Sequence, residues 1–247
     1  MGSQDSLAFI IPAYNEEALL PATLKTVFEI KEQLSDFTSR VIVVDNNSTD
    51  STSLVALNAG AEVIFEPYNQ ISKARNTGAK ACSEVDFIFF IDADTFPTLI
   101  VVEKALEVLK TGHYCGGGCM VKFSKPSLFV SFWSIITKVT NMAAGAFIFC
   151  TNEAYKGTGG YDESIYAAED VVFSRAVNKW GKKNGCKGFT ILTEHFITTS
   201  DRKINWYSKW EILTKLFILG IMPWRLKHRK NADFWYKRPD CSSDKAE

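Results

Sequence analysis

The chain has 247 residues, 28 basic and 28 acidic side chains and 46% hydrophobic residues, which suits one or one and a half globular domains with a sizeable core. The balanced charge excludes the basic composition typical of nucleic-acid-binding proteins, so no nucleic-acid partner is expected. The six cysteines lack metal-ligand spacing and the first residues lack a signal-peptide pattern, so we expect reduced thiols and a cytoplasmic protein.

The first apolar segment, residues 7–11, predicts a buried strand that closes into a loop at Pro12. Apolar residues at helical spacing follow over residues 19–34. Asn15 is a favourable N-cap for that helix, and the acidic residues after it, beginning with Glu16, suit the positive end of the helix dipole.

The second unit repeats this design. Residues 40–45 predict a buried strand that ends in Asp45, and turn-forming residues then lead into a short helix that stops at Gly60. A third strand over residues 62–66 and a third helix over residues 72–82 continue the alternation.

The fourth strand, residues 87–91, is continuously apolar, as is typical of a strand that helices cover on both faces. It runs straight into Asp92 and Asp94. Two carboxylates this close repel each other unless a cation lies beside them, and hard divalent ions prefer such oxygen ligands. An N-cap for the helix predicted over residues 99–109 is the alternative, but a cap needs only one Asp. The pattern favours a metal site.

Strands that alternate with helices predict an α/β fold with a mostly parallel central sheet flanked by helices. Glu16, Asp45 and Asp92 each follow the carboxyl end of a strand, so we expect all three at one edge of the sheet, where such folds bind ligands. There is no G-x-G-x-x-G after the first strand and no P-loop, which argues against dinucleotide-binding and NTPase functions.

The composition shifts after residue 112. Glycines 116–118 lead into a strand over residues 120–123, and a strand is expected at residues 146–150. Between them, residues 127–145 are apolar at helical spacing but carry polar interruptions, which argue against a membrane span. A last helix is expected from Glu169 to about residue 180, with Gly181 beyond its end.

Taken together, five motifs in order resemble a glycosyltransferase of family 2, the large inverting group with the GT-A (nucleotide-diphospho-sugar transferase) fold. The resemblance covers residues 7–202. The motifs are IPAYNE at 11–16, VDNNSTD at 44–50, ARNTG at 74–78, DAD at 92–94, and GGYDE at 159–163 followed by Glu169 and Asp170.

The resemblance implies that the sugar donor is a nucleoside diphosphate sugar, most often uridine-linked, whose nucleotide lies across the strand ends. Asp45 would accept an N–H from the edge of the base. The other residues implied in binding the nucleotide or its diphosphate are Pro12, Tyr14, Glu16, Lys73, Arg75, Asp92 and Ala93.

It also implies that Asp94 binds Mn²⁺ or Mg²⁺ directly while Asp92 shares the metal and the ribose, so that the metal neutralises charge on the departing diphosphate. Asp170 matches the catalytic base, which takes the proton of an acceptor hydroxyl in a single inverting displacement. Glu169 would orient the acceptor or cap the helix that begins at this residue.

Two further residues follow the Glu169–Asp170 pair. His195, on a strand expected at residues 191–197, has a spacing seen for a third metal ligand in some relatives, although a lone histidine on a strand is as often a partly buried structural residue. Arg202 could close over the diphosphate, and an ordinary surface charge is the alternative.

The resemblance divides the chain into a catalytic domain, residues 1–203, and an extension, residues 204–247. Within the domain, residues 7–112 would bind the nucleotide and residues 113–203 the acceptor, a glycan or a lipid-linked molecule. An aromatic stripe and a basic cluster over residues 204–230 suit a helix lying on the cytoplasmic face of a membrane. A tail packed on the domain or a dimer contact fits as well, and the oligomeric state is left open.

Two other functions compete with a metal-dependent glycosyltransferase. A sugar nucleotidyltransferase would share the α/β architecture but would carry a glycine-rich, basic loop after the first strand, which residues 12–17 lack. A non-catalytic nucleotide-sugar-binding protein has no need to keep both Asp94 and Asp170. Metal-dependent transfer is therefore the favoured prediction.

Overall fold

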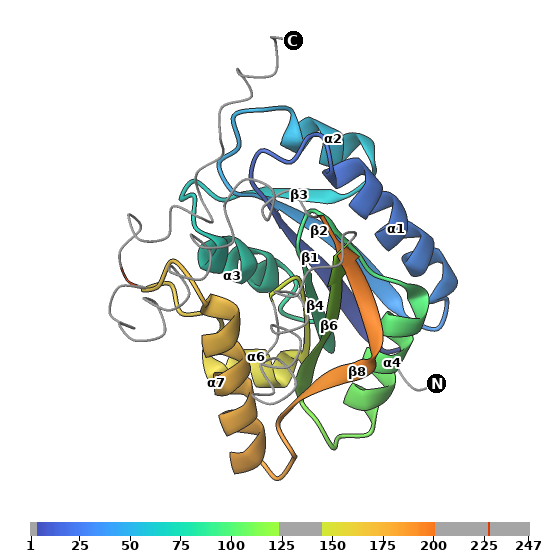
Figure 1. Ribbon diagram of the computed structural model, residues 1–247, viewed down its shortest axis with the longest axis vertical. Coiled ribbons are helices and arrows are strands. Elements are labelled where there is room, and N and C mark those ends of the chain that lie inside the picture. The colour runs from blue at the N-terminus through green and yellow to red at the C-terminus, as the bar shows by residue number, and fades with distance from the viewer. Residues whose placement is uncertain (1–3, 124–144, 201–226, 228–247) are drawn as a thin grey trace.

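Parallel pairing of the first four strands confirms the alternation expected from the sequence. In the computed structural model, β1 (Ser6–Ala13) lies between β2 (Thr38–Asp45) and β4 (Phe87–Ile91), and β3 (Glu62–Phe65) pairs with the outer side of β2. All these pairings are parallel, so the four carboxyl ends lie at one edge (Figure 1). The structure describes residues 4–123, 145–200 and residue 227. The segment of helical spacing that begins at residue 127 lies outside this part up to residue 144, as do Arg202 and the extension apart from residue 227.

The second half of the sheet is mixed. β7 (Phe147–Thr151) is antiparallel to β4 and to β6 (Gly116–Phe123). β8 (Phe189–Thr199) runs parallel to β6 and antiparallel to the two-residue β5 (Thr95–Phe96). The strand order within the described residues is β3-β2-β1-β4-β7-β6-β8-β5.

Helices cover both faces of this sheet, as Figure 1 shows. On one face lie α1 (Leu20–Gln33) and α4 (Leu99–Lys110), and on the other lie α3 (Ile71–Ala81), α6 (Asn152–Thr158) and α7 (Glu169–Lys183). The short α2 (Thr52–Asn58) packs beside α1. No helix in the described ranges has the length and apolar character needed to cross a membrane.

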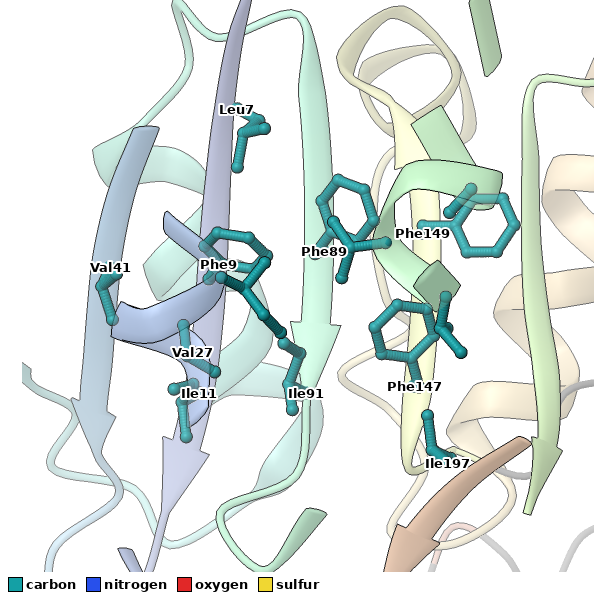
Figure 2. Close-up of a cluster of buried hydrophobic side chains, with 14 of the residues drawn as sticks. Leu7, Phe9, Ile11, Val27, Val41, Phe89, Ile91, Phe147, Phe149 and Ile197 are labelled. Atoms are coloured by element: carbon teal, nitrogen blue, oxygen red, sulfur yellow. The ribbon is translucent and has the colours of Figure 1, made fainter. Parts of the chain in front are cut away.

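Aromatic rings fill the layer between the sheet and α1 and α4. Phe89 lies at the centre of this cluster, with its ring 5.5 Å from that of Phe9 and 5.9 Å from that of Phe147 (Figure 2). Successive residues of β1 alternate between this cluster and the core on the other face. The whole of β4 is buried, which confirms the prediction of a strand covered on both sides.

The helix starts differ from two predictions. α1 begins at Leu20, with Pro21 in its first turn, and Asn15 lies before it in a left-handed conformation, so Asn15 is not its N-cap. The N-cap of α4 is Thr98, whose hydroxyl accepts the N–H of Val101. Neither Asp92 nor Asp94 caps this helix, so the prediction that one of them could serve as its N-cap is wrong.

Two later elements also depart from expectation. α7 continues through Gly181 to Lys183. Gly181 does not end the helix but lies against Cys115 and Gly188, where a Cβ would come within 2.6 Å of an atom of each. The unpredicted α6 is capped at its start by the hydroxyl of Thr151 and ends at Gly159 with φ of 80°.

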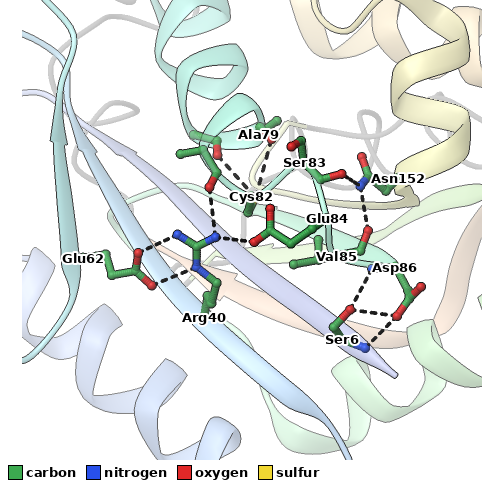
Figure 3. Close-up of polar contacts among 12 residues, drawn as sticks. Ser6, Arg40, Glu62, Ala79, Cys82, Ser83, Glu84, Val85, Asp86 and Asn152 are labelled. Atoms are coloured by element: carbon green, nitrogen blue, oxygen red, sulfur yellow. Dashed lines mark hydrogen bonds and ion pairs between the residues drawn. The ribbon is translucent and has the colours of Figure 1, made fainter. Parts of the chain in front are cut away.

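The amino edge of the sheet, opposite the candidate site, is held by Arg40. Its guanidinium donates to both carboxylate oxygens of Glu62, at 3.0 and 2.7 Å, and to Glu84 at 2.6 Å (Figure 3). A further bond to the carbonyl of Ala81 joins β2 to the end of α3. This cluster fixes the end of α3 that lies away from the ligand-binding edge.

Candidate functional site

The loops that leave β1 and β2 are bonded to each other at the carboxyl edge. Ala13 pairs with Asp45, and the carbonyl of Ala13 accepts the N–H of Asn46 at 2.8 Å. The N–H of Glu16 donates to the hydroxyl of Thr52 at 2.8 Å, and the Glu16 side chain is buried. Glu16, Asp45 and Asp92 therefore share the edge predicted for them, because β1, β2 and β4 are parallel.

The carboxylate of Asp45 is fixed by its own turn. One oxygen accepts the N–H of Ser48 at 2.9 Å and the other accepts the hydroxyl of Ser53. Asn46 next to it accepts the N–H of Gln70 at 3.0 Å, which joins this turn to the start of α3. Asp45 is thus held in one orientation before any ligand arrives.

The remaining residues predicted to bind the nucleotide differ in exposure. Pro12 is buried within β1, which continues past it to Ala13 and does not close into a loop at the proline. β4 pairs with β1 only as far as Ile10, so the missing N–H of Pro12 costs no hydrogen bond to β4. Tyr14 is partly exposed at the edge. Lys73 places its ammonium 3.9 Å from the ring centre of the exposed Tyr68.

The segment from Asp92 to Asp94 is pinned from three sides. The N–H of Asp92 donates to the carbonyl of Ala146 at 3.1 Å, and the carbonyl of Ala93 accepts the hydroxyl of Thr23, from α1, at 2.7 Å. The carbonyl of Asp94 accepts the N–H of Ser200, just after β8, at 3.1 Å. The two carboxylates therefore leave a rigid corner, with Asp94 buried and Asp92 21% exposed.

Arg75 lies behind this corner on the buried face of α3 and is only 1% exposed. Its guanidinium donates to Asp92 at 3.0 Å and to Glu169, the first residue of α7, at 2.8 Å. A third bond goes to the carbonyl of Gly145 at 3.2 Å, and the ring of Tyr161 lies 5.1 Å away. Arg75 thereby connects the carboxylates of two distant parts of the chain.

Asp170 follows Glu169 in the first turn of α7, which begins after the left-handed Ala168. Burial of the Asp170 carboxyl and, after it, the negative charge of Glu169 raise the pKa of this group from 3.8 to about 7, although the positive charge of Arg75 opposes both. A carboxyl group whose pKa lies near neutrality can exchange a proton with a bound hydroxyl.

The carboxylates at the corner fit a hard divalent cation. Asp92 and Asp94 supply oxygen ligands, and Mg²⁺ is commonly held by one or two carboxylates together with water and substrate phosphates. In the described ranges no three His, Cys, Asp or Glu side chains gather into a metal-binding group. A cation held here would therefore need phosphate or water oxygens as further ligands.

Within the described residues, His195 does not gather with Asp92 and Asp94 into a metal-binding group. The partners of β6 skip from Leu192 to Phe196, so Thr193, Glu194 and His195 form a bulge in β8. β8 meets the corner at Thr199, four residues later, which is about 13 Å along an extended strand. This distance along the backbone does not favour His195 as a third metal ligand, and that role stays a prediction.

Sequence reasoning gave no role to Asn76 and Gln70, which hold the loop that leads into α7. The Asn76 side chain donates to the carbonyl of Tyr161 at 2.9 Å and accepts the Tyr161 N–H at 2.9 Å. Gln70 donates to the carbonyls of Glu163 and Ile165. The sequence of α3 did indicate such a role, because the buried face of this helix carries polar residues where apolar residues are usual.

Comparisons with known proteins agree on the type of domain. The model of a family described as glycosyl transferase family 2 matches residues 8–161, more than half of the chain. An uncharacterized glycosyltransferase of Mycobacterium tuberculosis is 37% identical over 90 residues, which are 36% of this chain and 37% of that protein. A dolichyl-phosphate beta-glucosyltransferase of Mus musculus is 34% identical over 118 residues, 42% of this chain and 36% of that protein. The matches span little more than a third of the length of these relatives.

Two solved structures show the same fold. A mannosyltransferase from Pyrobaculum calidifontis, in complex with GDP-Man and Mn²⁺, has a TM-score of 0.65 and 16% identity, covering 80% of this chain and 57% of that one. A glucosyl-3-phosphoglycerate synthase from Mycobacterium tuberculosis, in complex with Mn²⁺, UDP and glucosyl-3-phosphoglycerate, has a TM-score of 0.58 and 16% identity, covering 82% and 74%. At this identity the likeness concerns the fold alone.

Proposed function

This chain belongs to glycosyl transferase family 2 and has the GT-A fold, and on that premise we propose that it transfers a sugar from a nucleoside diphosphate sugar to an acceptor hydroxyl with inversion. The observation that carries the proposal is the arrangement around Arg75. Asp92, beside Asp94, and Glu169, beside Asp170, meet on one buried guanidinium. One guanidinium therefore joins a corner suited to a cation to the helix start that carries a carboxyl suited to proton transfer.

The nucleotide would lie across the strand ends, with Pro12, Tyr14, Glu16 and Asp45 around its base and ribose. The fixed orientation of Asp45 suits recognition of an N–H on the edge of a base. Uridine is the base we propose, since UDP occupies the related synthase, while the related mannosyltransferase holds GDP-Man. Lys73 would lie near the diphosphate.

Mn²⁺ or Mg²⁺ would be held by Asp94, with Asp92 sharing it and the ribose. When bound, the metal would neutralise the charge that develops on the departing diphosphate. The two solved relatives contain Mn²⁺, which supports a divalent ion in this fold. The contribution of the chain itself is the rigid corner, which orients both carboxylates before the sugar donor binds.

Asp170 would act as the general base. Its carboxylate would take the proton of the acceptor hydroxyl as that oxygen attacks the anomeric carbon from the face opposite the leaving group, so a single displacement inverts the centre. A pKa near 7 makes the Asp170 carboxyl a better proton acceptor than an ordinary aspartate, while leaving much of it ionised near neutral pH.

The acceptor would be bound by residues 113–203, and residues 7–112 would bind the nucleotide. A glycan or a lipid-linked acceptor is proposed, and the name of the mouse relative, a dolichyl-phosphate beta-glucosyltransferase, supports the lipid-linked alternative. Membrane contact through residues 204–230 and closure of Arg202 over the diphosphate remain predictions, because these residues lie outside the described part.

The test combines binding with product analysis. The full chain is incubated with a panel of UDP- and GDP-sugars, with and without Mn²⁺, and its melting temperature is measured, because a ligand that binds only the folded state raises it. Pairs that raise it are then assayed with glycan and lipid acceptors. Release of the nucleoside diphosphate supports the proposal, and binding without turnover on any acceptor overturns it. In a parallel assay with a nucleoside triphosphate and a sugar 1-phosphate, release of pyrophosphate indicates a nucleotidyltransferase and also overturns the proposal.

A further inference from the structure

The guanidinium of Arg75 spans the two halves of the candidate site. Asp92 follows β4 in the half predicted to bind the nucleotide, whereas Glu169 opens α7 in the half predicted to bind the acceptor. We propose that Arg75 is a positioning residue. It holds the first turn of α7, which carries Asp170, at a fixed place relative to the corner formed by Asp92 and Asp94. The inference rests on the function proposed above and replaces the sequence-based expectation that Arg75 contacts the diphosphate.

The bonds of Arg75 leave little of it available to a ligand. Both terminal nitrogens are engaged by Asp92, Glu169 and the carbonyl of Gly145, and the side chain is 1% exposed. Its third nitrogen, Nε, is buried and has no partner among the described residues. A group that grips a diphosphate must present free N–H donors to the crevice, and Arg75 presents its donors to protein carboxylates instead.

The geometry requires a guanidinium. Its two terminal nitrogens lie in one plane and reach Glu169 at 2.8 Å and Asp92 at 3.0 Å at the same time. A lysine ammonium is a single compact centre and would keep one of these partners at best. Loss of the bridge would leave Glu169 buried with an uncompensated charge, so the first turn of α7 would shift and carry Asp170 with it.

The pH profile of kcat is a readout that would stay unchanged if Arg75 had a purely structural role, because charged groups around Asp170 set the pKa of its carboxyl. The charged groups that act on its carboxyl are Glu169 and Asp92, which raise its pKa, and Arg75, which lowers it. Removal of Arg75 should therefore raise the pKa of Asp170, and neutralisation of Glu169 should lower it. Two substitutions that break the same bond should thus move the pH profile in opposite directions.

The experiment compares Arg75→Met, Glu169→Gln and the double variant with the wild type. For Arg75→Met we expect kcat to fall about 100-fold through misplacement of the base, with the KM for the sugar donor changed by less than about threefold. The lower limb of the pH profile of kcat should move up by about one unit in Arg75→Met and down in Glu169→Gln. Arg75→Lys should retain part of kcat.

Arg40→Met is the matched control, because Arg40 also forms a two-carboxylate cluster, with Glu62 and Glu84, but at the opposite edge of the sheet. It should lower the melting temperature and leave both kcat and the pH profile unchanged. If Arg75→Met raises the KM for the sugar donor with kcat intact, Arg75 is a ligand contact. If it lowers only the melting temperature, as Arg40→Met does, the bridge is purely structural. Either result overturns the inference.

A measurement without substrate separates this inference from the proposed function. A double-mutant cycle on the unfolding of the ligand-free protein should give a coupling between Arg75→Met and Glu169→Gln, since each removes the same buried ion pair. If the wild type turns over no nucleotide sugar while this coupling is present, the proposed function fails and the bridge stands. If the two effects are additive in a turning-over enzyme, the bridge fails and the proposed function stands.

Discussion

Gly145 lies directly against the carboxylate of Asp170. A Cβ placed on Gly145 would come within 2.6 Å of Oδ2 of Asp170, and the backbone at Gly145 has a φ of +56°, which favours glycine. The carbonyl of the same residue accepts a bond from Arg75 at 3.2 Å. One glycine thus makes room for the proposed base and accepts a bond from the guanidinium that joins Glu169, next to that base, to Asp92.

The first prediction concerns this contact. Gly145→Ala should lower kcat about 100-fold, because the new methyl group displaces the Asp170 carboxylate and a misplacement of that size is enough to slow a positioned proton transfer. The measurement is steady-state turnover of the best sugar donor and acceptor pair.

Gly112→Ala is the control for Gly145→Ala. Gly112 has a similar φ of +69°, but a Cβ placed on it would have no atom within 4 Å, so this variant has the same backbone strain without the clash. Equal losses of activity in the two variants would show that strain, and not displacement of Asp170, is responsible.

The second prediction concerns pH. With the pKa of Asp170 at about 7, kcat should rise with pH and reach half of its plateau near neutrality, since only the ionised carboxylate accepts the proton. Asp170→Asn should lower kcat by about 10²- to 10⁴-fold while binding of the nucleoside diphosphate persists. A flat profile between pH 5 and 9, or full activity in Asp170→Asn, would rule Asp170 out as the base.

Asp170 should also influence stability, with a definite sign. Its carboxyl ionises near pH 4 in the unfolded chain and near 7 in the folded one, so its contribution to stability falls as the pH rises through that window. Asp170→Asn should therefore raise the melting temperature at pH 8 and leave it nearly unchanged at pH 4. Differential scanning calorimetry at the two pH values checks this, and equal shifts at both would contradict the raised pKa.

The third prediction separates the metal ligands. Asp94→Asn should reduce the Mn²⁺-dependent affinity for UDP or GDP by more than about tenfold, because a directly coordinating carboxylate is lost. His195→Ala should bind UDP or GDP with the Mn²⁺ dependence of the wild type, since His195 does not gather with Asp92 and Asp94 into a metal-binding group in the described residues. Isothermal titration with and without Mn²⁺ measures both. Loss of Mn²⁺-dependent binding in His195→Ala would contradict this prediction and support His195 as a third metal ligand.

Local patterns in the sequence were sufficient for the first four strands and for the edge of the sheet at which they end. The continuous apolar run at residues 87–91 corresponds to β4 residue for residue, because a strand buried on both faces needs no alternation. Asp45 and Asp92 could be placed at one edge because parallel strands end together. The two-residue β5 and the seven-residue α6 were missed, since neither is long enough to show a period.

The partners of buried charges could not be read from the sequence in the same way. Arg75 and Glu169 are 94 residues apart, and nothing local to either indicates the other. Spacing alone also could not predict the local register around His195, because a bulge changes the register of a strand without any signal in its apolar pattern. What sequence reasoning lacked was the three-dimensional path of α3 and β8 relative to the corner.

The last prediction tests the packing that sets the path of α3. A Cβ on Gly78 would lie 2.4 Å from Cγ2 of Ile10 and 3.0 Å from Cγ2 of Val44, so α3 can approach β1 and β2 this closely only with glycine at that position. Alanine in an open helix interior would stabilise it by about 1 kcal/mol relative to glycine, whereas overpacking costs about 1–3 kcal/mol. The sign of the change in unfolding free energy therefore decides between the two effects.

We expect Gly78→Ala to destabilise the protein by about 1–2 kcal/mol in urea unfolding. Ile10→Ala removes the colliding methyl group, so the double variant should be less destabilised than the sum of the two single variants. Because α3 carries Arg75, the shift of the helix should also lower kcat in the folded fraction. Stabilisation by Gly78→Ala would show that α3 has room to move and that contact with β1 does not fix the position of Arg75.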